Sequence, residues 1–136
     1  MSQENVEVIE RFADCWSRGD WEGCQALADP EVEQHPTVGG VEGGRVLRGV
    51  DEIRRDYEEV EETWDEHRIE MERVIDAGDR VVLLHHEYYR GRSSGVELEI
   101  DAAVVYDLRD GRIVRVQGYM DRAAALDAVG LGKQDT

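Results

Sequence analysis

The sequence predicts an α+β domain in which N-terminal helices pack on one face of a strongly curved β-sheet. Three observations lead to this prediction. Apolar residues recur at helical spacing in the first part of the chain, strand-like segments follow one another from residue 67 to residue 120, and the links between these segments are short. Short links imply antiparallel neighbours, and helices folded over one face of a bent sheet leave a cone that is open at one end.

Two helices are predicted first. The first has Ser2 as its cap and ends at Gly19, and Asp20 caps a second, short helix that stops at Asp29 and Pro30. The apolar face of the first helix is predicted to contain Val6, Ile9, Phe12, Ala13 and Trp16.

A short strand at 31–35 and a glycine-rich loop at 37–46 precede the third helix, which begins near Val50. Its buried stripe is predicted to contain Val50, Ile53, Tyr57, Val60 and Trp64. Its glutamates, among them Glu61, are assigned mainly to the solvated side.

Four strands are predicted at 67–76, 80–90, 96–108 and 112–120, and they form an antiparallel meander. Asp121 caps a last helix. The sequence contains no repeat and no internal boundary, so we expect a single domain over 1–130 and a short tail over 131–136.

Composition excludes some partners. The 32 acidic and 16 basic residues give a net charge of −16, which would repel nucleic acids and anionic membrane surfaces. Cys15 and Cys24 lie among apolar neighbours and are expected to be buried free thiols. No signal peptide or membrane-spanning run is recognisable, so a cytoplasmic protein is expected.

Several short motifs occur in a specific order along nearly the whole chain: RGD at 18–20, DPEVE at 29–33, RG at 48–49, AGDRV at 77–81 and LRDGRIVR at 108–115. In this order they resemble the SnoaL-like proteins of the nuclear transport factor 2-like superfamily, which also contains the ketosteroid isomerases. The resemblance implies a cone with a mostly apolar pocket at its wide end, and a homodimer formed through the outer face of the sheet. The fold supports isomerases, polyketide cyclases, epoxide hydrolases, dehydratases and non-catalytic proteins, so it does not by itself give the function.

The resemblance does not extend to the catalytic groups of the isomerases. Phe12, His35 and Ala103 stand where those enzymes carry a tyrosine, an aspartate base and a protonated aspartate. Phe12 and Ala103 have no proton to donate to an enolate, so steroid isomerase activity is not predicted. Asp101 is the nearest candidate for the acid/base aspartate of the cyclases.

The segment VVLLHHEYY, Val81 to Tyr89, places polar residues in the most apolar strand. Side chains alternate across a strand, so His85 and Glu87 share one face. Alignment with the ketosteroid isomerases on Gly91 puts this face inside the cone. Counting from Ala103 along the next strand gives Asp101 the same inward direction. Burial there is expected to raise the pKa of Glu87.

The predicted site therefore combines a polar cluster with apolar walls. His35 and Glu87 would exchange protons, His85 and Asp101 would orient the substrate, and the substrate would be an apolar ring compound. The other predicted contact residues are Phe12, Trp16, Leu83, Ala103, Val105 and Met120. The resemblance implies no cofactor, and no metal is predicted.

The sequence leaves the alternatives open. His85 and Glu87 can equally satisfy each other as a structural pair, or lie exposed where the strand leaves the core. In that case the chain would be a non-catalytic dimeric binding or interaction module whose cone is filled by side chains. Turnover is not decided by the sequence.

Overall fold

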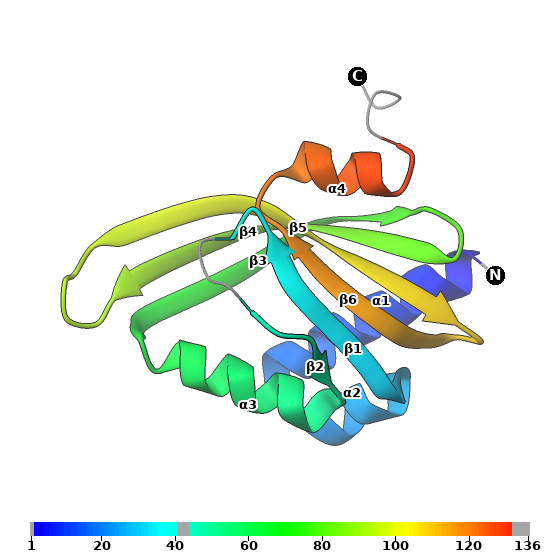
Figure 1. Cartoon of the computed structure of the whole chain (residues 1–136), viewed down its shortest axis with the longest axis horizontal. Coiled ribbons are helices and arrows are strands. Elements are labelled where there is room, and N and C mark those ends of the chain that lie inside the picture. Colours follow the sequence, from blue (N-terminus) through cyan, green and yellow to red (C-terminus); the bar gives the residue numbers. More distant parts are fainter. Residues whose placement is uncertain (1, 41–43, 132–136) are drawn as a thin grey trace.

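The computed structural model describes residues 2–40 and 44–131. Apart from a two-residue strand at 47–48 that was not predicted, helices and strands within these residues follow the predicted order (Figure 1). The helices are α1 (Ser2–Arg18), α2 (Trp21–Leu27), α3 (Val50–Glu61) and α4 (Arg122–Ala128). The strands are β1 (Ala28–Val38), β2 (Leu47–Arg48), β3 (Trp64–Asp76), β4 (Arg80–Gly91), β5 (Glu97–Arg109) and β6 (Arg112–Tyr119).

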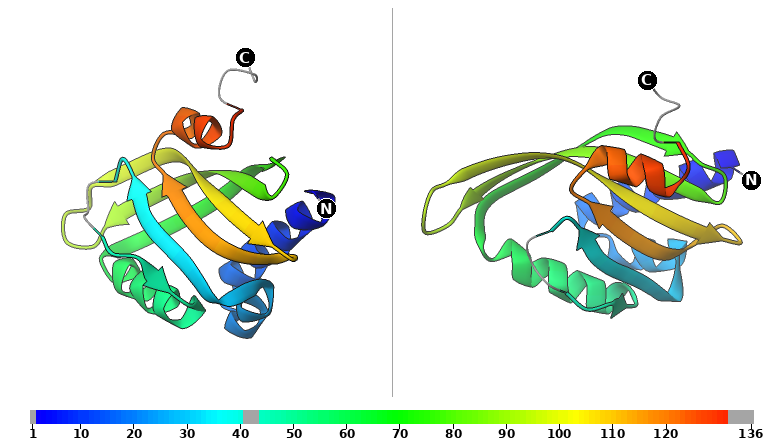
Figure 2. Two further views of the ribbon diagram at one scale, coloured as in Figure 1. Left: turned by 45° about the vertical axis from the view of Figure 1, so that its right-hand side comes forward. Right: turned by 45° about the horizontal axis from the view of Figure 1, so that its top comes forward.

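The strands form one open, mixed sheet in the order β2-β1-β6-β5-β4-β3. Strands β3 to β6 are an antiparallel meander, and β1 joins β6 in parallel. The sheet is strongly bent around α1, α2 and α3, which lie together on one side of it (Figures 1 and 2). The predicted α+β cone is therefore confirmed.

Local sequence explains where the helices begin and end. The backbone of Gly19 has φ +70°, a left-handed conformation that ends α1. The side chain of Asp20 accepts a hydrogen bond from the Gly23 amide and caps α2, and Asp121 accepts one from the Ala123 amide and caps α4.

Some predicted boundaries are wrong. Trp64 was assigned to the buried stripe of the third helix, but α3 ends at Glu61 and Trp64 is the first residue of β3. The strand predicted at 31–35 extends over Ala28–Val38. Part of the predicted glycine-rich loop (41–43) and most of the predicted tail (132–136) lie outside the described residues.

The sheet has two covered faces. The face toward α1, α2 and α3, which we call the inner face, contributes Val81, Leu83 and Tyr106 to the main hydrophobic core. On the opposite, outer face, α4 packs over a smaller cluster that contains Val82, Ala103, Val105 and Ala125. Figure 1 shows α4 on the side of the sheet away from the other helices.

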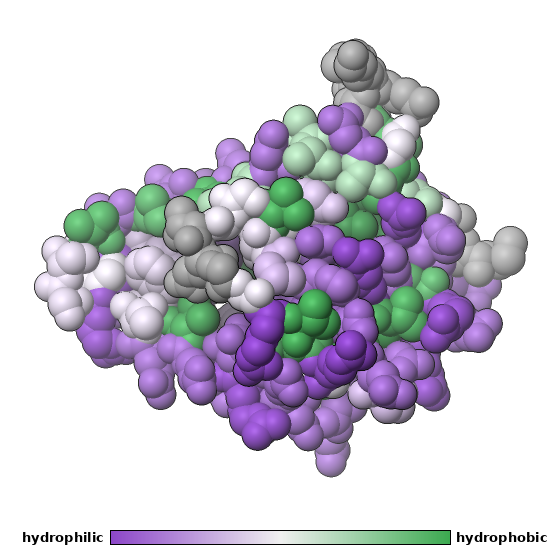
Figure 3. Space-filling model, viewed as in Figure 1, coloured by the Kyte–Doolittle hydropathy of each residue, from purple (hydrophilic) through white to green (hydrophobic). Residues whose placement is uncertain are grey.

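Cys15 and Cys24 are buried and unpaired, as predicted. Among the described residues, no helix has both the length and the apolar character that a membrane span requires. Hydrophilic residues dominate the surface seen in Figure 3, with a few separate apolar areas, in keeping with the net charge of −16.

Candidate functional site

Nine side chains on the inner face form three rows across β3, β4 and β5. Directly opposed residues of an antiparallel pair share a face, so the pairing defines the rows. The rows are His67–Tyr89–Leu98, Ile69–Glu87–Ile100 and Met71–His85–Ala102. We call these nine residues the inner-face patch.

Hydrogen bonds join the polar members of the patch to α3. Glu87 Oε1 accepts hydrogen bonds from His67 Nε2 at 3.0 Å and from the Tyr89 hydroxyl at 2.6 Å. His67 Nδ1 donates in turn to Glu61 Oε1 at the end of α3. Both ring nitrogens of His67 therefore donate to carboxylates, which requires an imidazolium.

Aromatic contacts hold this hydrogen-bonded group in place. The rings of His67 and Tyr89 are stacked with centroids 4.3 Å apart, and Trp64 lies against Tyr89 at 4.7 Å. On the other side, Tyr57 of α3 lies 6.4 Å from His67 and 5.1 Å from Trp16 of α1. The polar group is thus enclosed between the sheet and two helices.

The charges of the group support one another. Burial alone would lower the pKa of His67, but its hydrogen bonds with Glu87 and Glu61 outweigh burial, and the pKa is raised. Burial alone would raise the pKa of Glu87, but hydrogen bonds from His67 and Tyr89 outweigh it, and the pKa is lowered. The raised pKa predicted for Glu87 is therefore wrong, because its hydrogen-bond donors were not foreseen.

His85 differs from His67. It is 7% exposed, and its Nδ1 lies 3.7 Å from Glu87 Oε2, beyond hydrogen-bonding distance. Nδ1 has no hydrogen-bond partner among the described residues. Burial lowers the pKa of His85, and the nearby Glu87 carboxylate only partly offsets this, so His85 is neutral at pH 7.

Apolar side chains border the polar group and face solvent. Ile69 and Met71, directly opposite Glu87 and His85 on β3, are 45% and 51% exposed. Leu98, opposite Tyr89 on β5, is 47% exposed. The patch therefore has a buried polar centre with apolar edges that are open to solvent.

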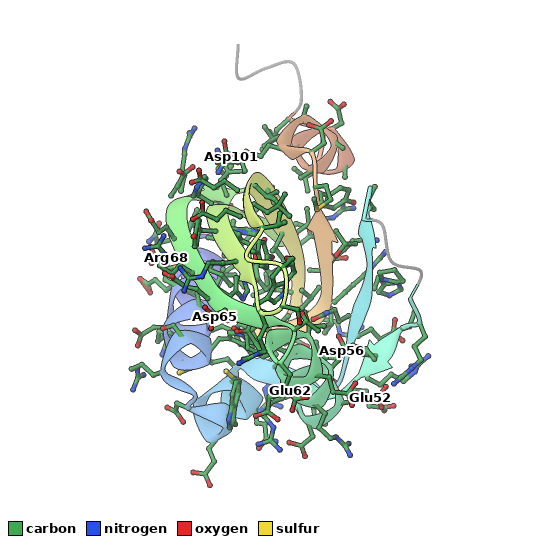
Figure 4. All side chains as sticks on the ribbon, turned by 90° about the vertical axis from the view of Figure 1, so that its left-hand side faces the viewer. Glu52, Asp56, Glu62, Asp65, Arg68 and Asp101 are labelled. Carbon is green, nitrogen blue, oxygen red and sulfur yellow. The ribbon has the colours of Figure 1, made fainter. Side chains whose placement is uncertain are left out.

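Asp101 does not belong to this group. It pairs with His86, so it lies on the outer face, and the inward direction predicted for it is wrong. Figure 4 shows Asp101 toward α4, on the opposite side of the sheet from Glu62 at the end of α3. His86 donates hydrogen bonds to Asp101 at 2.6 Å and Glu99 at 2.9 Å, and these bonds raise the pKa of His86 to about 9.

Two predicted contact residues lie on the outer face for the same reason. Ala103 and Val105 alternate with the inner-face residues of β5 and are buried beneath α4. Neither can contact a ligand bound on the inner-face patch.

His35 is also separated from Glu87. It pairs with Gln117, which in turn pairs with Val105, so it lies on the outer side of the sheet. Two strands, β6 and β5, stand between β1 and β4. His35 Nε2 instead lies 2.9 Å from Glu33 Oε1 on its own strand. The predicted four-residue polar cluster is thus reduced to His85 and Glu87.

The remaining predicted wall residues serve different purposes. Phe12 and Leu83 are buried in the main core, where Phe12 contacts Tyr106 at 6.2 Å. Trp16 packs against that core and contacts Tyr57. Met120 is 38% exposed just after β6.

Among the described residues, one group of three side chains on the outer face could bind a metal ion. Donor atoms of Glu72, His86 and Asp101 lie within 4.8 Å of one another. Arg122 already donates to Glu72 at 2.6 Å and lies 3.8 Å from Asp101, so a guanidinium supplies the positive charge there. This arrangement is an exposed ion-pair network.

Two hollows on the surface lie elsewhere. The larger, of about 460 Å³, is lined by residues of α2, β1, β2 and the beginning of α3, and the smaller by Arg45 and α3. Neither is lined by a residue of the inner-face patch or by a predicted wall residue.

The predicted site does not include three members of the hydrogen-bonded group, His67, Glu61 and Tyr89. The charge pattern of the third helix predicts Glu61 on the solvated side, and His67 carries no signal beyond its place at the start of a predicted strand. The alternation in β4 that paired His85 with Glu87 also includes Tyr89, so this residue could have been found from the sequence.

Comparison with known proteins gives the family. A SnoaL-like domain model matches residues 9–116, which is most of the chain. The chain belongs to the SnoaL-like family. No functionally curated protein matches its sequence.

Solved structures of several proteins share this fold. TerC, crystallised with polyporic acid, has a TM-score of 0.71 at 23% identity, with 93% of this chain and 98% of TerC covered. A putative SnoaL-like polyketide cyclase from Jannaschia has a TM-score of 0.74 at 17% identity, with coverage of 98% and 94%. A protein with a ketosteroid isomerase-like fold from Catenulispora acidiphila, in complex with trimethylamine, has a TM-score of 0.68 at 15% identity, with coverage of 92% and 93%.

Proposed function

We propose that this SnoaL-like protein binds a small molecule on the inner-face patch. The observation that carries the proposal is that the exposed apolar side chains of Ile69 and Met71 lie directly opposite a half-buried carboxylate, Glu87, and a buried histidine, His85. Such a combination gives a ligand apolar area together with a small number of orienting polar groups. The ligand would lay its apolar body on β3 and direct a polar group toward β4.

Similar proteins support a small-molecule ligand. TerC was crystallised with polyporic acid, and the Catenulispora protein was crystallised with trimethylamine. These two molecules differ greatly in size and charge. The comparison therefore supports the kind of function but not the identity of the ligand.

Proton transfer is the second candidate function, and the chain Glu61–His67–Glu87 favours it. Glu61 is partly exposed, while Glu87 adjoins the patch, so His67 connects a carboxylate near solvent to one that a ligand would meet. An isomerase or cyclase acting on an apolar ring compound would use Glu87 as its base. Because the pKa of Glu87 is lowered, such a reaction requires a substrate whose C–H proton is already acidic, such as one beside two carbonyl groups.

The expected homodimer is also part of this proposal. α4 covers one part of the outer face, so an outer-face interface would be confined to the strip around His86 and Tyr88. Light scattering of the purified protein tests this, because a mass of one chain would contradict it. A cytoplasmic location remains the prediction from the sequence.

Binding can be tested with matched variants. Isothermal titration of apolar ring compounds that raise the melting temperature should give several-fold weaker binding to an Ile69→Ser, Met71→Ser double variant. Both residues are exposed, so folding should be unaffected. The control is Val38→Ser, which removes a 43% exposed apolar side chain from β1. Equal affinity in all three proteins would overturn the proposed location.

Turnover can be tested without knowing the product. Proton transfer at carbon exchanges hydrogen for deuterium when the reaction runs in deuterium oxide, and nuclear magnetic resonance detects this exchange in each bound compound. Glu87→Gln should abolish enzyme-dependent exchange even at ligand concentrations that saturate the variant. Exchange that continues at the parent rate would exclude Glu87 as the base.

A further inference from the structure

One pair of atoms on the inner-face patch has unused hydrogen-bonding capacity. His85 Nδ1 is buried and has no hydrogen-bond partner among the described residues. Glu87 accepts hydrogen bonds from His67 and Tyr89 through one oxygen, Oε1, and its other oxygen, Oε2, lies 3.7 Å from His85 Nδ1. Buried polar atoms in native proteins nearly always have a partner, so an unpaired one points to a missing group.

Both atoms can act as acceptors. The carboxylate of Glu87 is ionised, because His67 and Tyr89 donate to it. A neutral His85 presents an acceptor at Nδ1 when its proton is on Nε2. The group that would satisfy both atoms at once is a hydrogen-bond donor, with His85 as its Nε2–H tautomer.

The distance between these acceptors limits what the donor can be. At 3.7 Å they are too far apart to bond directly. For one donor atom placed roughly 2.9 Å from each acceptor, the acceptor–donor–acceptor angle is roughly 80°. Two N–H bonds on a single nitrogen can reach both acceptors at this angle if each hydrogen bond bends slightly. A hydroxyl group has one hydrogen and could satisfy only one of the two acceptors.

Charge then favours a cation. Glu61 and Glu87 flank a single imidazolium, so this group carries one net negative charge, and the whole chain carries −16. An anionic ligand would be repelled, whereas an ammonium would form a charge-assisted hydrogen bond with Glu87.

We propose that His85 Nδ1 and Glu87 Oε2 together bind the nitrogen of a protonated primary or secondary amine whose apolar substituent lies on Ile69 and Met71. This proposal rests on the proposed function, since it assigns a ligand class to the same surface. It adds a requirement for at least two N–H bonds on the ligand nitrogen, together with an apolar body large enough to cross from β4 to β3.

Three matched compounds test the proposal by isothermal titration. Benzylamine has both the charge and the N–H bonds, benzyltrimethylammonium has the charge alone, and benzyl alcohol has one donor and no charge. Benzylamine should bind the parent protein at least about tenfold more tightly than either of the others.

Variants identify the atoms responsible. Glu87→Gln and His85→Phe should each weaken benzylamine binding about tenfold or more. His86→Phe and Glu97→Gln are the matched controls, because they change the outer face of the same strand pair and should leave the affinity unchanged. The comparison of compounds on the parent protein does not depend on any variant folding.

The results separate this proposal from the proposed function. Equal affinity for benzylamine and benzyl alcohol would overturn the amine site, and equal affinity for benzyltrimethylammonium would overturn the need for N–H bonds. In either case, weaker binding of all compounds by the Ile69→Ser, Met71→Ser variant would still support a ligand surface at the patch. Failure of every benzyl compound and every ring compound to bind would overturn both proposals.

Discussion

Substitution of Glu87 by glutamine should destabilise the fold by a measurable amount. Glu87 Oε1 accepts two hydrogen bonds, from His67 and Tyr89, and both are charge-assisted. Such bonds contribute about 1.5–3 kcal/mol, whereas neutral ones contribute about 0.5–1.5 kcal/mol, so converting both lowers the free energy of unfolding by about 2 kcal/mol. Removing a buried charge also relieves a desolvation penalty, which brings the net loss to about 1–2 kcal/mol.

Thermal unfolding is the direct assay. An unfolding entropy of about 2.1 cal/mol/K per residue over 136 residues makes 1 kcal/mol equivalent to about 3.5 °C. The melting temperature should therefore fall by about 4–7 °C at pH 7. Glu97→Gln is the control, since Glu97 accepts a hydrogen bond from Tyr88 on the exposed outer face and should leave the melting temperature close to that of the parent.

The pH dependence of this difference follows from the sign of the shift. The pKa of Glu87 is lowered in the folded protein, so its contribution is present above the pKa of an unfolded glutamate, about 4.3, and is lost as the pH falls through the folded value. The difference between parent and Glu87→Gln should thus be large near pH 6 and disappear in strong acid. A Glu87→Gln protein as stable as the parent at pH 6 would refute the reasoning.

Three further predictions concern other parts of the molecule. The pKa of His67 is raised, so its contribution to stability is present below about pH 6.5 and is lost as the pH rises through the folded value. Between pH 6 and pH 9 the melting temperature of the parent should therefore fall more than that of His67→Gln. Parallel melting curves against pH would contradict this. Leu83→Ala removes a buried core side chain and should lower the free energy of unfolding in urea by about 2–4 kcal/mol; a loss below about 1 kcal/mol would show that the site collapses around the gap. Asp20→Ala removes the cap of α2 and should lower stability by about 1 kcal/mol, whereas Asp20→Asn, which keeps an acceptor, should have a smaller effect; equal losses would argue against the cap.

The fold could be predicted from the sequence because its signals are local. The helical spacing around Phe12, the Asp20 cap and the short turns between the last four strands each act over a few residues. The inner position of His85 and Glu87 follows from alternation in β4 alone, since this strand pairs with β5 without a register shift.

The direction of Asp101 could not be predicted in the same way. It was obtained by aligning this strand with that of the isomerases, and a slip of one residue in such an alignment transfers a whole strand to the other face. Within β5 the two faces alternate without interruption, because Val104 and Tyr106 belong to the main core on the inner face and Ala103 and Val105 belong to the cluster under α4. The position at which the strand is aligned, and not the alternation, therefore decided the face predicted for Asp101.

His67 illustrates a second limit. Its contact with Glu87 depends on the register of β3 against β4, and that register shifts at Glu72, the extra residue between Met71 and Arg73. Without the shift, His67 would oppose Arg90 instead of Tyr89. Its second partner, Glu61, comes from the final turn of α3, whose distance from the sheet depends on tertiary packing.

The position of Trp64 makes the patch optically accessible. The chain contains three tryptophans, and the rings of Trp16 and Trp21 form an edge-to-face pair with centroids 5.0 Å apart. Trp64 stands apart from this pair and packs on Tyr89, whose hydroxyl group donates to Glu87. Fluorescence from Trp64 should therefore change when a ligand displaces solvent beside Glu87, and occupancy could be followed in the unlabelled protein.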